Sequence, residues 1–403
     1  MQRLVRSLRS LYHFSLAWAA SLYYHNPSVG LFVIGVTGTK GKSSTIELMN
    51  AALEAQGLRT ALFTSVRSKI LGESVPNTTG NSMPGRFVLQ RFLRRAADAG
   101  ATHILLEVTS EGVSQYRHRF IAWDAAVFVN LHPEHIEAHG GFERYREAKL
   151  SFFSYVARFS PKRVKRFFVN GDDPSAPLFS AAAAPHPVHL FGGGFFTANY
   201  NAARSLGASL GIPAETIERA LASFPGVPGR MEYLLREPFT VLVDYAHTPD
   251  SLEALYAHLR AERLGAGRLI AVFGSAGGGR DTWKRPVLGG VAARRADHTI
   301  LTDEDPFDED PAAIVEAIAE GFRLEAAGRQ SASLEVILDR REAIRRALSL
   351  ARSGDTVALT GKGSESAIRR ARGAREAWKE AEVAREILRE LGYSGDAPLP
   401  QYS

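Results

Sequence analysis

Residues 35–44 read Gly-Val-Thr-Gly-Thr-Lys-Gly-Lys-Ser-Ser, which are the residue types of a phosphate-binding loop. The run is one residue longer than the usual loop, but residues 37–44, here called the phosphate loop, keep its working end. Glycines let backbone N–H groups turn around an anion, and the start of a helix adds positive charge. Lys42 can reach the outer phosphates, and the Ser43 hydroxyl suits Mg²⁺. The run therefore predicts a nucleoside triphosphate site. Its candidate contacts are Thr37, Gly38, Thr39, Lys40, Gly41, Lys42, Ser43 and Ser44.

Further along the chain, three more residues have side chains that are suited to phosphate or metal chemistry. Glu107 ends an apolar run, where an unpaired carboxylate would be costly unless it faced a cleft or a metal. His135 lies in the loop 130–139, which is rich in side chains that bind metals or phosphates. Lys149 follows on a predicted helix whose other face is strongly apolar. From the pattern alone, a surface lysine is the simpler interpretation.

Apolar runs typical of strands alternate with helical stretches along the chain. This alternation is typical of parallel sheets joined by crossover helices, so we predict an α/β fold. The predicted strands are 31–36, 60–64, 103–108, 125–130 and 166–170 in a first series, and 240–245, 268–274, 298–303, 334–338 and 356–360 in a second.

A proline- and glycine-rich stretch at 225–229 separates the two series and is predicted to be a linker. We therefore expect three parts: an N-terminal helical segment over 1–30, a central ATP-binding domain with a parallel-type sheet over 31–228, and a second α/β domain over 229–403.

Composition limits the possible functions. Of 403 residues, 45% are hydrophobic and 23% are charged, which is typical of a globular protein of two or three domains. The net charge of +6 is compatible with an anionic substrate. However, the sequence has no basic stripe with interleaved aromatic residues, so nucleic acid is not an expected partner. The absence of cysteine excludes disulfides, thiolate catalysis and cysteine-bound zinc. Use of ATP would fit a cytoplasmic location.

Residues 1–26 contain three arginines followed by an apolar stretch, a pattern that superficially resembles a signal peptide. His13 and several serines interrupt the apolar part, which is also too short to span a bilayer. Because apolar residues recur at roughly helical spacing, we expect a packed amphipathic helix and no stable membrane insertion. A helix that lies on a membrane surface is the alternative.

Seven motifs occur together in the order and spacing of the Mur ligases. They read G-V-T-G-T-K-G-K-S-S, E-V-T-S-E-G, V-N-L-H-P-E-H-I-E-A-H-G, Y-R-E-A-K, P-G-R-M-E, D-Y-A-H-T-P-D and G-K-G-S-E. From about Leu31 to its C-terminus the chain resembles this family, and most of all the members that add the third residue of the peptidoglycan stem peptide. The resemblance implies a central ATPase domain and a C-terminal Rossmann-like domain that delivers the incoming amino acid. It also implies ATP-dependent amide formation through an acyl phosphate.

The same resemblance implies roles for the residues that match the motifs. Lys42 would hold the β- and γ-phosphates, Ser43 and Glu107 would bind one Mg²⁺, and His135 would serve a second. Lys149 matches the lysine that the family carbamylates with CO₂, which turns a cation into a carboxylate-like support for the metal. The other implied nucleotide contacts are Asn201 at the adenine, Arg230 and His247 at the phosphates, and Asp244 at the ribose. The implied substrate contacts are Thr78, Thr79, Arg117, Asp305, Lys362 and Glu365.

Three features depart from the family pattern. About thirty residues precede the first strand, too few for the family's UDP-binding domain, so we expect uridine to contribute little to binding. Phe307 stands where an arginine clamps diaminopimelate, and phenylalanine cannot make the bidentate bonds of arginine to a carboxylate. Lys40 replaces a common asparagine. Arg86 follows a rearranged segment, where it either offers an anion contact or lies in solvent.

The predicted function is an ATP-dependent ligase that adds an amino acid to a muramyl-peptide-like acidic substrate in cell-wall synthesis, with or without a nucleotide sugar. A folylpolyglutamate or cyanophycin-type ligase and a non-catalytic ATP-binding regulator are the alternatives. The motifs D-Y-A-H-T-P-D and G-R-M-E favour the muramyl substrate. The joint presence of the candidate metal ligands argues against a pure binder, and a motor or transport ATPase would lack the later motifs. We expect ATP and two Mg²⁺ ions to be bound, and we expect the protein to be a monomer.

Overall fold

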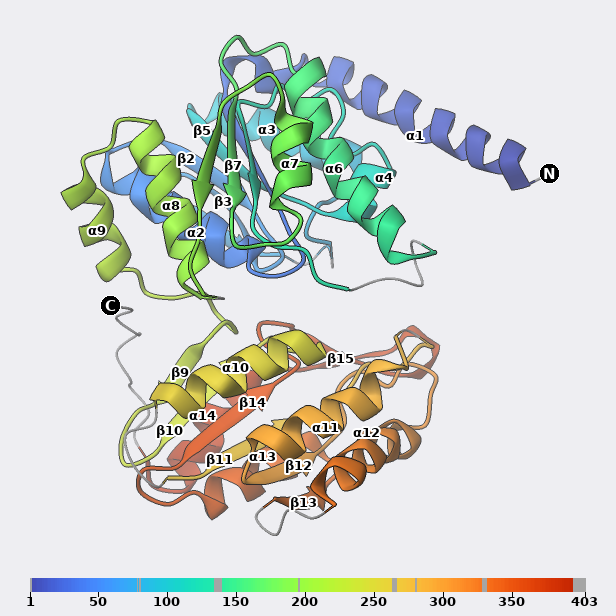
Figure 1. Cartoon of the computed structure of the whole chain (residues 1–403), viewed down its shortest axis with the longest axis vertical. Coiled ribbons are helices and arrows are strands. Elements are labelled where there is room, and N and C mark those ends of the chain that lie inside the picture. The colour runs from blue at the N-terminus through green and yellow to red at the C-terminus, as the bar shows by residue number, and fades with distance from the viewer. Residues whose placement is uncertain are drawn as a thin grey trace. The chain divides into compact units, whose positions relative to one another are not determined.

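The computed structural model describes residues 2–77, 79, 81–133, 140–194, 196–262, 267–279, 281–327 and 332–393. Two compact units make up the chain, a first unit over Met1–Phe224 and a second unit over Pro225–Pro400. Each unit is an α/β structure, as Figure 1 shows, and each is described by itself below.

The described residues of the first unit form an eight-stranded sheet in the order β4-β3-β2-β5-β1-β6-β7-β8. In this spatial order, the six strands β2, β5, β1, β6, β7 and β8 pair in parallel, which confirms the predicted parallel sheet. The antiparallel pairs of β2 with β3 and β3 with β4 were not predicted, because 65–76 is half-buried or exposed and lacks an apolar alternation. The bounds are β1 Phe32–Thr37, β2 Thr60–Phe63, β3 Arg67–Ile70, β4 Glu73–Pro76, β5 His103–Val108, β6 Ala125–Phe128, β7 Arg166–Asn170 and β8 Val188–Phe191.

Helices cover both faces of this sheet (Figure 1). Successive residues of β1 and β5 alternate between two apolar cores, because side chains of a strand point to opposite faces in turn. One core contains α3, α6 and α7, and the other contains α2, α8 and α9. The bounds are α1 Gln2–Tyr23, η1 Pro27–Gly30, α2 Lys42–Ala55, α3 Arg86–Asp98, α4 Ser110–Ser114, α6 Phe142–Phe159, α7 Ala176–Ala183, α8 Thr197–Ser209 and α9 Ala214–Ala222.

The predicted N-terminal helix is confirmed as α1. Ala17 and Ala20 are buried where α1 packs against the rest of the first unit, while Leu11 and Trp18 are exposed. Ser21 Oγ donates to the Phe120 carbonyl, which fixes the C-terminal part of the helix. No helix in the described part of the chain is long and apolar enough to cross a membrane.

The second unit contains, among its described residues, a six-stranded sheet in the order β13-β12-β11-β14-β10-β9. The five predicted strands β10 to β14 pair in parallel, and β9 joins β10 antiparallel at one edge. A small hairpin, β15–β16, follows the sheet. The strand bounds are β9 Glu232–Leu235, β10 Thr240–Asp244, β11 Leu269–Phe273, β12 His298–Leu301, β13 Ser333–Val336, β14 Thr356–Thr360, β15 Ala367–Arg369 and β16 Arg375–Ala377. The helices are α10 Pro249–Glu262, α11 Lys284–Arg295, α12 Pro311–Ala326, α13 Arg340–Leu350 and α14 Glu380–Glu390.

Candidate active site

The phosphate loop connects the central strand β1 to the start of α2. β1 lies between β5 and β6, and the carboxyl ends of adjacent parallel strands in such sheets form the usual ligand crevice. Gly41 adopts a φ of +78°, and a Cβ there would lie 2.6 Å from Asn199 Oδ1. At Gly38 a Cβ would lie 3.2 Å from Val129 Cβ. Glycine is therefore required at Gly41 by both conformation and space, and the loop is closely packed on two sides.

Glu107 contacts Ser43 of the phosphate loop directly. The parallel register places Glu107 of β5 opposite Val36 of β1. Glu107 Oε1 accepts hydrogen bonds from Ser43 Oγ and, at 2.8 Å, from Ser65 N. The hydroxyls of Ser43 and Ser65 are 2.8 Å apart. Two hydroxyls and a carboxylate converge here, which are oxygen ligands of the kind that Mg²⁺ prefers.

Lys42 folds back over the loop, where its Nζ donates to the carbonyls of Gly38 at 3.0 Å and Thr39 at 2.9 Å. Lys149 of α6 reaches the same place from another element, with Nζ 2.7 Å from the Gly38 carbonyl. Lys149 is only 2% exposed, so the interpretation from pattern alone, a surface lysine, is wrong. Periodicity missed it because Lys149 packs on the phosphate loop, whereas other charged residues of α6, such as Glu143 and Glu147, are exposed.

Two asparagines outside the predicted set position the phosphate loop. Asn130, which follows β6, accepts at Oδ1 from Thr39 N at 3.1 Å and Lys40 N at 2.9 Å, and its Nδ2 donates to the Lys40 carbonyl. Asn199 of α8 accepts from Thr45 Oγ1 at 2.9 Å. The signal for Asn130 was its place at the carboxyl end of a strand next to β1. Asn201, which the family resemblance implies at the adenine, lies two positions after Asn199 on the same helix.

We expect Asn130→Ala to weaken ATP binding about a hundredfold, because the loop loses three hydrogen bonds, each worth about 1 kcal/mol, that hold its backbone in place. The change should appear in the Kd for ATP, measured by calorimetry, with little change in Tm. Unchanged affinity would show that the loop holds its conformation without Asn130.

The remaining candidates of the first unit have mixed surroundings. Thr37 Oγ1 donates to the Val108 carbonyl, so this buried side chain joins two strands. Thr39 Oγ1 is 3.0 Å from the Tyr145 hydroxyl of α6. Asn201 Nδ2 donates to the Gly192 carbonyl at 2.6 Å. Ser44 is half-buried in the first turn of α2.

Among the candidate substrate contacts of the first unit, Arg117 Nη1 donates to the Met83 carbonyl and its Nη2 to Gln115 Oε1 at 2.9 Å. Thr79 is exposed, and its hydroxyl is 2.7 Å from Asn77 Oδ1. His135 and Thr78 lie outside the described residues.

Three candidates of the second unit come together around a buried lysine. Lys362 Nζ lies 2.7 Å from both Asp305 Oδ1 and Glu365 Oε2. Burial opposes the charge of Lys362, but Glu365 and Asp305 raise its pKa above the usual value. The lysine therefore remains a cation at neutral pH and holds two carboxylates beside the ends of β12 and β14.

The other second-unit candidates lie around the carboxyl end of β10. The Arg230 guanidinium lies 4.2 Å from the ring centroid of Tyr245, and His247 Nδ1 is 2.7 Å from the Tyr245 carbonyl. Asp244 accepts from the backbone N–H groups of Met231 and Ala246 at 2.8 and 2.7 Å.

Glu304 is a buried carboxyl outside the predicted set of site residues. Its Oε2 has no hydrogen-bond partner within the described part of the chain, and a Cβ on Gly361 would lie 2.3 Å from it. Burial raises the pKa of Glu304 to about 7, although Lys284, Arg340 and Lys362 act in the opposite direction. The group therefore changes charge near neutral pH.

This raised pKa makes stability depend on pH. Below the ordinary glutamate pKa of 4.5 the group is neutral in both folded and unfolded chains. As pH rises from there to about 7, only the unfolded chain ionises, so the free energy of unfolding falls, by about 3 kcal/mol at most. We expect Glu304→Gln to remove this slope in urea unfolding at about pH 5 and about pH 8. The exposed Glu316→Gln is the control. Equal slopes in wild type and Glu304→Gln would contradict the assignment.

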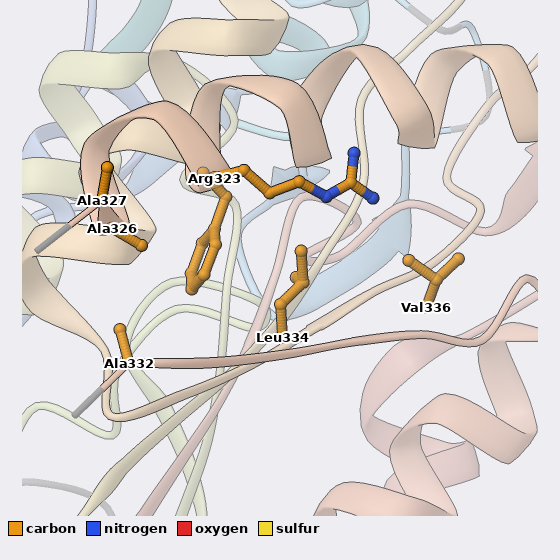
Figure 2. Close-up of a pocket in the computed structure, with 7 residues that line it drawn as sticks. Arg323, Ala326, Ala327, Ala332, Leu334 and Val336 are labelled. Carbon is orange, nitrogen blue, oxygen red and sulfur yellow. The ribbon is translucent and has the colours of Figure 1, made fainter. Parts of the chain in front are cut away.

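A pocket of about 450 Å³ lies elsewhere in the second unit, between α12 and β13 (Figure 2). Its lining is apolar except for Arg323, which pairs with Glu316. It contains none of the predicted site residues.

The chain matches known families over most of its length. Residues 36–210 match the Mur ligase middle domain, and residues 229–363 match the family described as Mur ligase, glutamate ligase domain. A UDP-N-acetylmuramyl-tripeptide synthetase of Roseiflexus sp. is 38% identical over 94% of this chain and 83% of its own. A UDP-N-acetylmuramoyl-L-alanyl-D-glutamate–2,6-diaminopimelate ligase of Syntrophomonas wolfei is 35% identical over 87% of this chain and 77% of its own.

Solved structures show the same similarity. A UDP-N-acetylmuramoyl-L-alanyl-D-glutamate–2,6-diaminopimelate ligase, 28% identical, superposes with a TM-score of 0.60 over 90% of this chain and 79% of that chain. A folylpolyglutamate synthase of Mycobacterium tuberculosis has a TM-score of 0.69 over 95% of this chain and 96% of that chain. At 17% identity, the second likeness shows a shared fold alone.

Proposed function

The chain belongs to the Mur ligase family of ATP-dependent enzymes that form amide bonds, and on this premise we propose that it adds an amino acid to an acidic muramyl peptide. The observation that carries the proposal is the convergence of Lys42, Lys149 and the Ser43–Glu107 pair on one phosphate loop. These groups come from three separate elements of the fold. A phosphate loop with a merely structural role has no need of a buried lysine and a buried carboxylate at its two sides.

The proposed reaction has two steps. The acceptor carboxylate attacks the γ-phosphorus of ATP, which forms an acyl phosphate and releases ADP. The amine of the incoming amino acid then attacks the acyl carbon, forms the amide, and releases inorganic phosphate and a proton. A carboxylate and a triphosphate repel each other, so the first step needs positive charge at the transferring group. Lys42 and the backbone N–H groups at the start of α2 supply it in our proposal.

The residues present fit a magnesium ion. No group of three or more His, Asp or Glu side chains in the described residues could hold a metal by itself. Mg²⁺ bound to a nucleotide uses only one or two protein ligands, and Ser43 with Glu107 provides that number. Bound there, the ion would neutralise charge on the phosphates. We propose His135 and Lys149 as the support of a second ion.

We propose that Lys149 is carbamylated. Its neutral amine would add to CO₂ and lose a proton, so that Nζ carries a carboxylate in place of a positive charge. The burial of Lys149 and its approach to the Gly38 carbonyl support this proposal, because the side chain already lies beside the phosphate loop. The product would be an oxygen ligand held by α6.

The acceptor and the amino acid are proposed to bind to different parts of the chain. We assign the triphosphate of ATP and the acceptor to 31–228, with Thr78, Thr79 and Arg117 as acceptor contacts, and the incoming amino acid to 229–403. We also propose Arg230, Asp244 and His247 as contacts of the nucleotide. Asp305, Lys362 and Glu365 form the network next to Phe307. Phenylalanine cannot bind a carboxylate through two hydrogen bonds. We therefore propose that Phe307 leaves the added amino acid without the arginine clamp that holds diaminopimelate.

A phosphate-release screen tests the proposed function. UDP-muramyl dipeptide and a muramyl dipeptide without UDP are each combined with ATP and single amino acids, and the product is identified by mass. We expect phosphate release that requires both an acceptor and an amino acid. ATP hydrolysis that is indifferent to both, or none under any combination, would count against a ligase.

A further inference from the structure

Four basic side chains gather where α1 packs on the first unit, and we call them the α1 cluster. Arg9 and His13 belong to α1, Arg86 is the first residue of α3, and Arg117 follows α4. Arg86 Nη2 and His13 Nδ1 are 2.5 Å apart. Arg9 and Arg117 are close enough to act on His13 electrostatically. The cluster therefore brings the N-terminal helix to two arginines of the central fold.

The contact with Arg86 decides the state of His13. A guanidinium has only hydrogen-bond donors, so His13 Nδ1 must accept, and the ring proton must sit on Nε2. Burial, followed by the charges of Arg86, Arg9 and Arg117, lowers the pKa of His13. His13 is therefore neutral at physiological pH and offers a lone pair to Arg86.

Negative charge is scarce around the α1 cluster. Among the residues that the structure describes, the carboxylate paired with these arginines is Glu111, which lies 3.8 Å from Arg117 and is 65% exposed. Arg86 instead donates to the Gln115 carbonyl, and Arg117 Nε is buried with no hydrogen-bond partner among the described residues. Burial and the Arg117 charge lower the pKa of Arg86. Two neighbouring guanidiniums partly withdrawn from water are costly, and a bound anion would offset that cost.

The α1 cluster follows the same strand that supplies Glu107. Arg117 is ten residues after Glu107, and α4 lies between them at the carboxyl end of β5. The carboxyl ends of parallel strands form the ligand edge of such a sheet. An anion in the cluster would therefore lie on the edge of the first unit that also holds the phosphate loop.

We propose that His13, Arg86 and Arg117 form an oxyanion site, in which α1 helps to bind a phosphate or carboxylate group of the acceptor. That the oxyanion belongs to the acceptor rests on the proposed function. The anion accepts from the guanidiniums of Arg86 and Arg117, and its negative charge favours the protonated form of His13, in which Nδ1 gives up its contact with Arg86. Arg9 adds attraction from the exposed side of α1.

His13 itself reports on this site. Its pKa is measured by NMR on the full chain labelled at histidine, with inorganic phosphate or L-alanyl-D-glutamate as the probe. The Lys42→Ala variant is used throughout, so that phosphate does not bind at the phosphate loop. We expect an upward shift in the His13 pKa with at least one probe. The probe that produces it identifies phosphate or carboxylate as the preferred group.

Variants of α3 provide the matched comparison. Arg86→Gln should weaken binding of the effective probe about tenfold, because one charge-assisted pair is lost. Arg94→Gln, on the same helix and paired with Asp98, should leave it unchanged. His13→Gln should weaken binding without changing Tm, which separates binding from folding.

Two results would overturn the inference: a His13 pKa that neither probe moves, or equal binding by Arg86→Gln and the Lys42→Ala parent. The measurement needs no catalysis. If the His13 pKa shifts but the wild-type chain fails the phosphate-release screen, the anion site stands and the proposed ligase activity is wrong. If the chain ligates but the His13 pKa does not shift, the ligase activity stands and the anion site is wrong.

Discussion

Lys42→Ala is expected to lower ATP turnover roughly a thousandfold while the chain still folds. Lys42 Nζ is bonded to the Gly38 and Thr39 carbonyls, so the side chain lies over the phosphate loop and outside the apolar cores. Its loss removes positive charge from the phosphates and little packing. Steady-state phosphate release measures the effect, and thermal unfolding should show a Tm near that of wild type.

A surface lysine provides the control for this change. Lys379 is exposed and pairs with Glu382, so Lys379→Ala should leave turnover intact. Turnover by Lys42→Ala within a few-fold of wild type would remove the assignment of residues 37–44 as a phosphate loop.

Lys149→Ala is expected to be nearly inactive and to regain part of its activity with formate or acetate. The substitution removes the proposed carbamate from beside Gly38, and a short carboxylic acid can occupy the space and restore the negative group. Activity of the wild type should also fall when CO₂ and bicarbonate are removed from the buffer. Both effects are measured by phosphate release in the presence of acceptor and amino acid.

Two comparisons distinguish a carbamate from a plain cation at Lys149. Lys149→Met keeps most of the buried volume, so its Tm shows how much of the loss comes from packing. If methylamine and not formate restores activity to Lys149→Ala, the lysine acts through its positive charge. The proposal that Lys149 is carbamylated would then be wrong.

Much of the fold could be predicted because its signals are local. The alternation of apolar runs and helices indicated parallel sheets in both series, and the structure has them. The short strands β3 and β4 escaped prediction because their residues are half-buried or exposed, so hydrophobic alternation does not mark them. The edge strands β8 and β9 were also missed, because β8 is largely exposed and β9 directly follows the stretch predicted to be a linker.

The sequence by itself determined the phosphate loop, the α/β class and the family, because each depends on residue types at close spacing or on the order of motifs. Which distant residues meet was decided only by the tertiary structure. Lys149 is buried against Gly38, and Asn130 holds the loop backbone, because β6 and α6 lie beside β1 in the strand order. His13 meets Arg86 across 73 residues because α1 packs against α3. A helical pattern shows which residues share a face, but the partner of that face depends on packing between elements far apart in the chain.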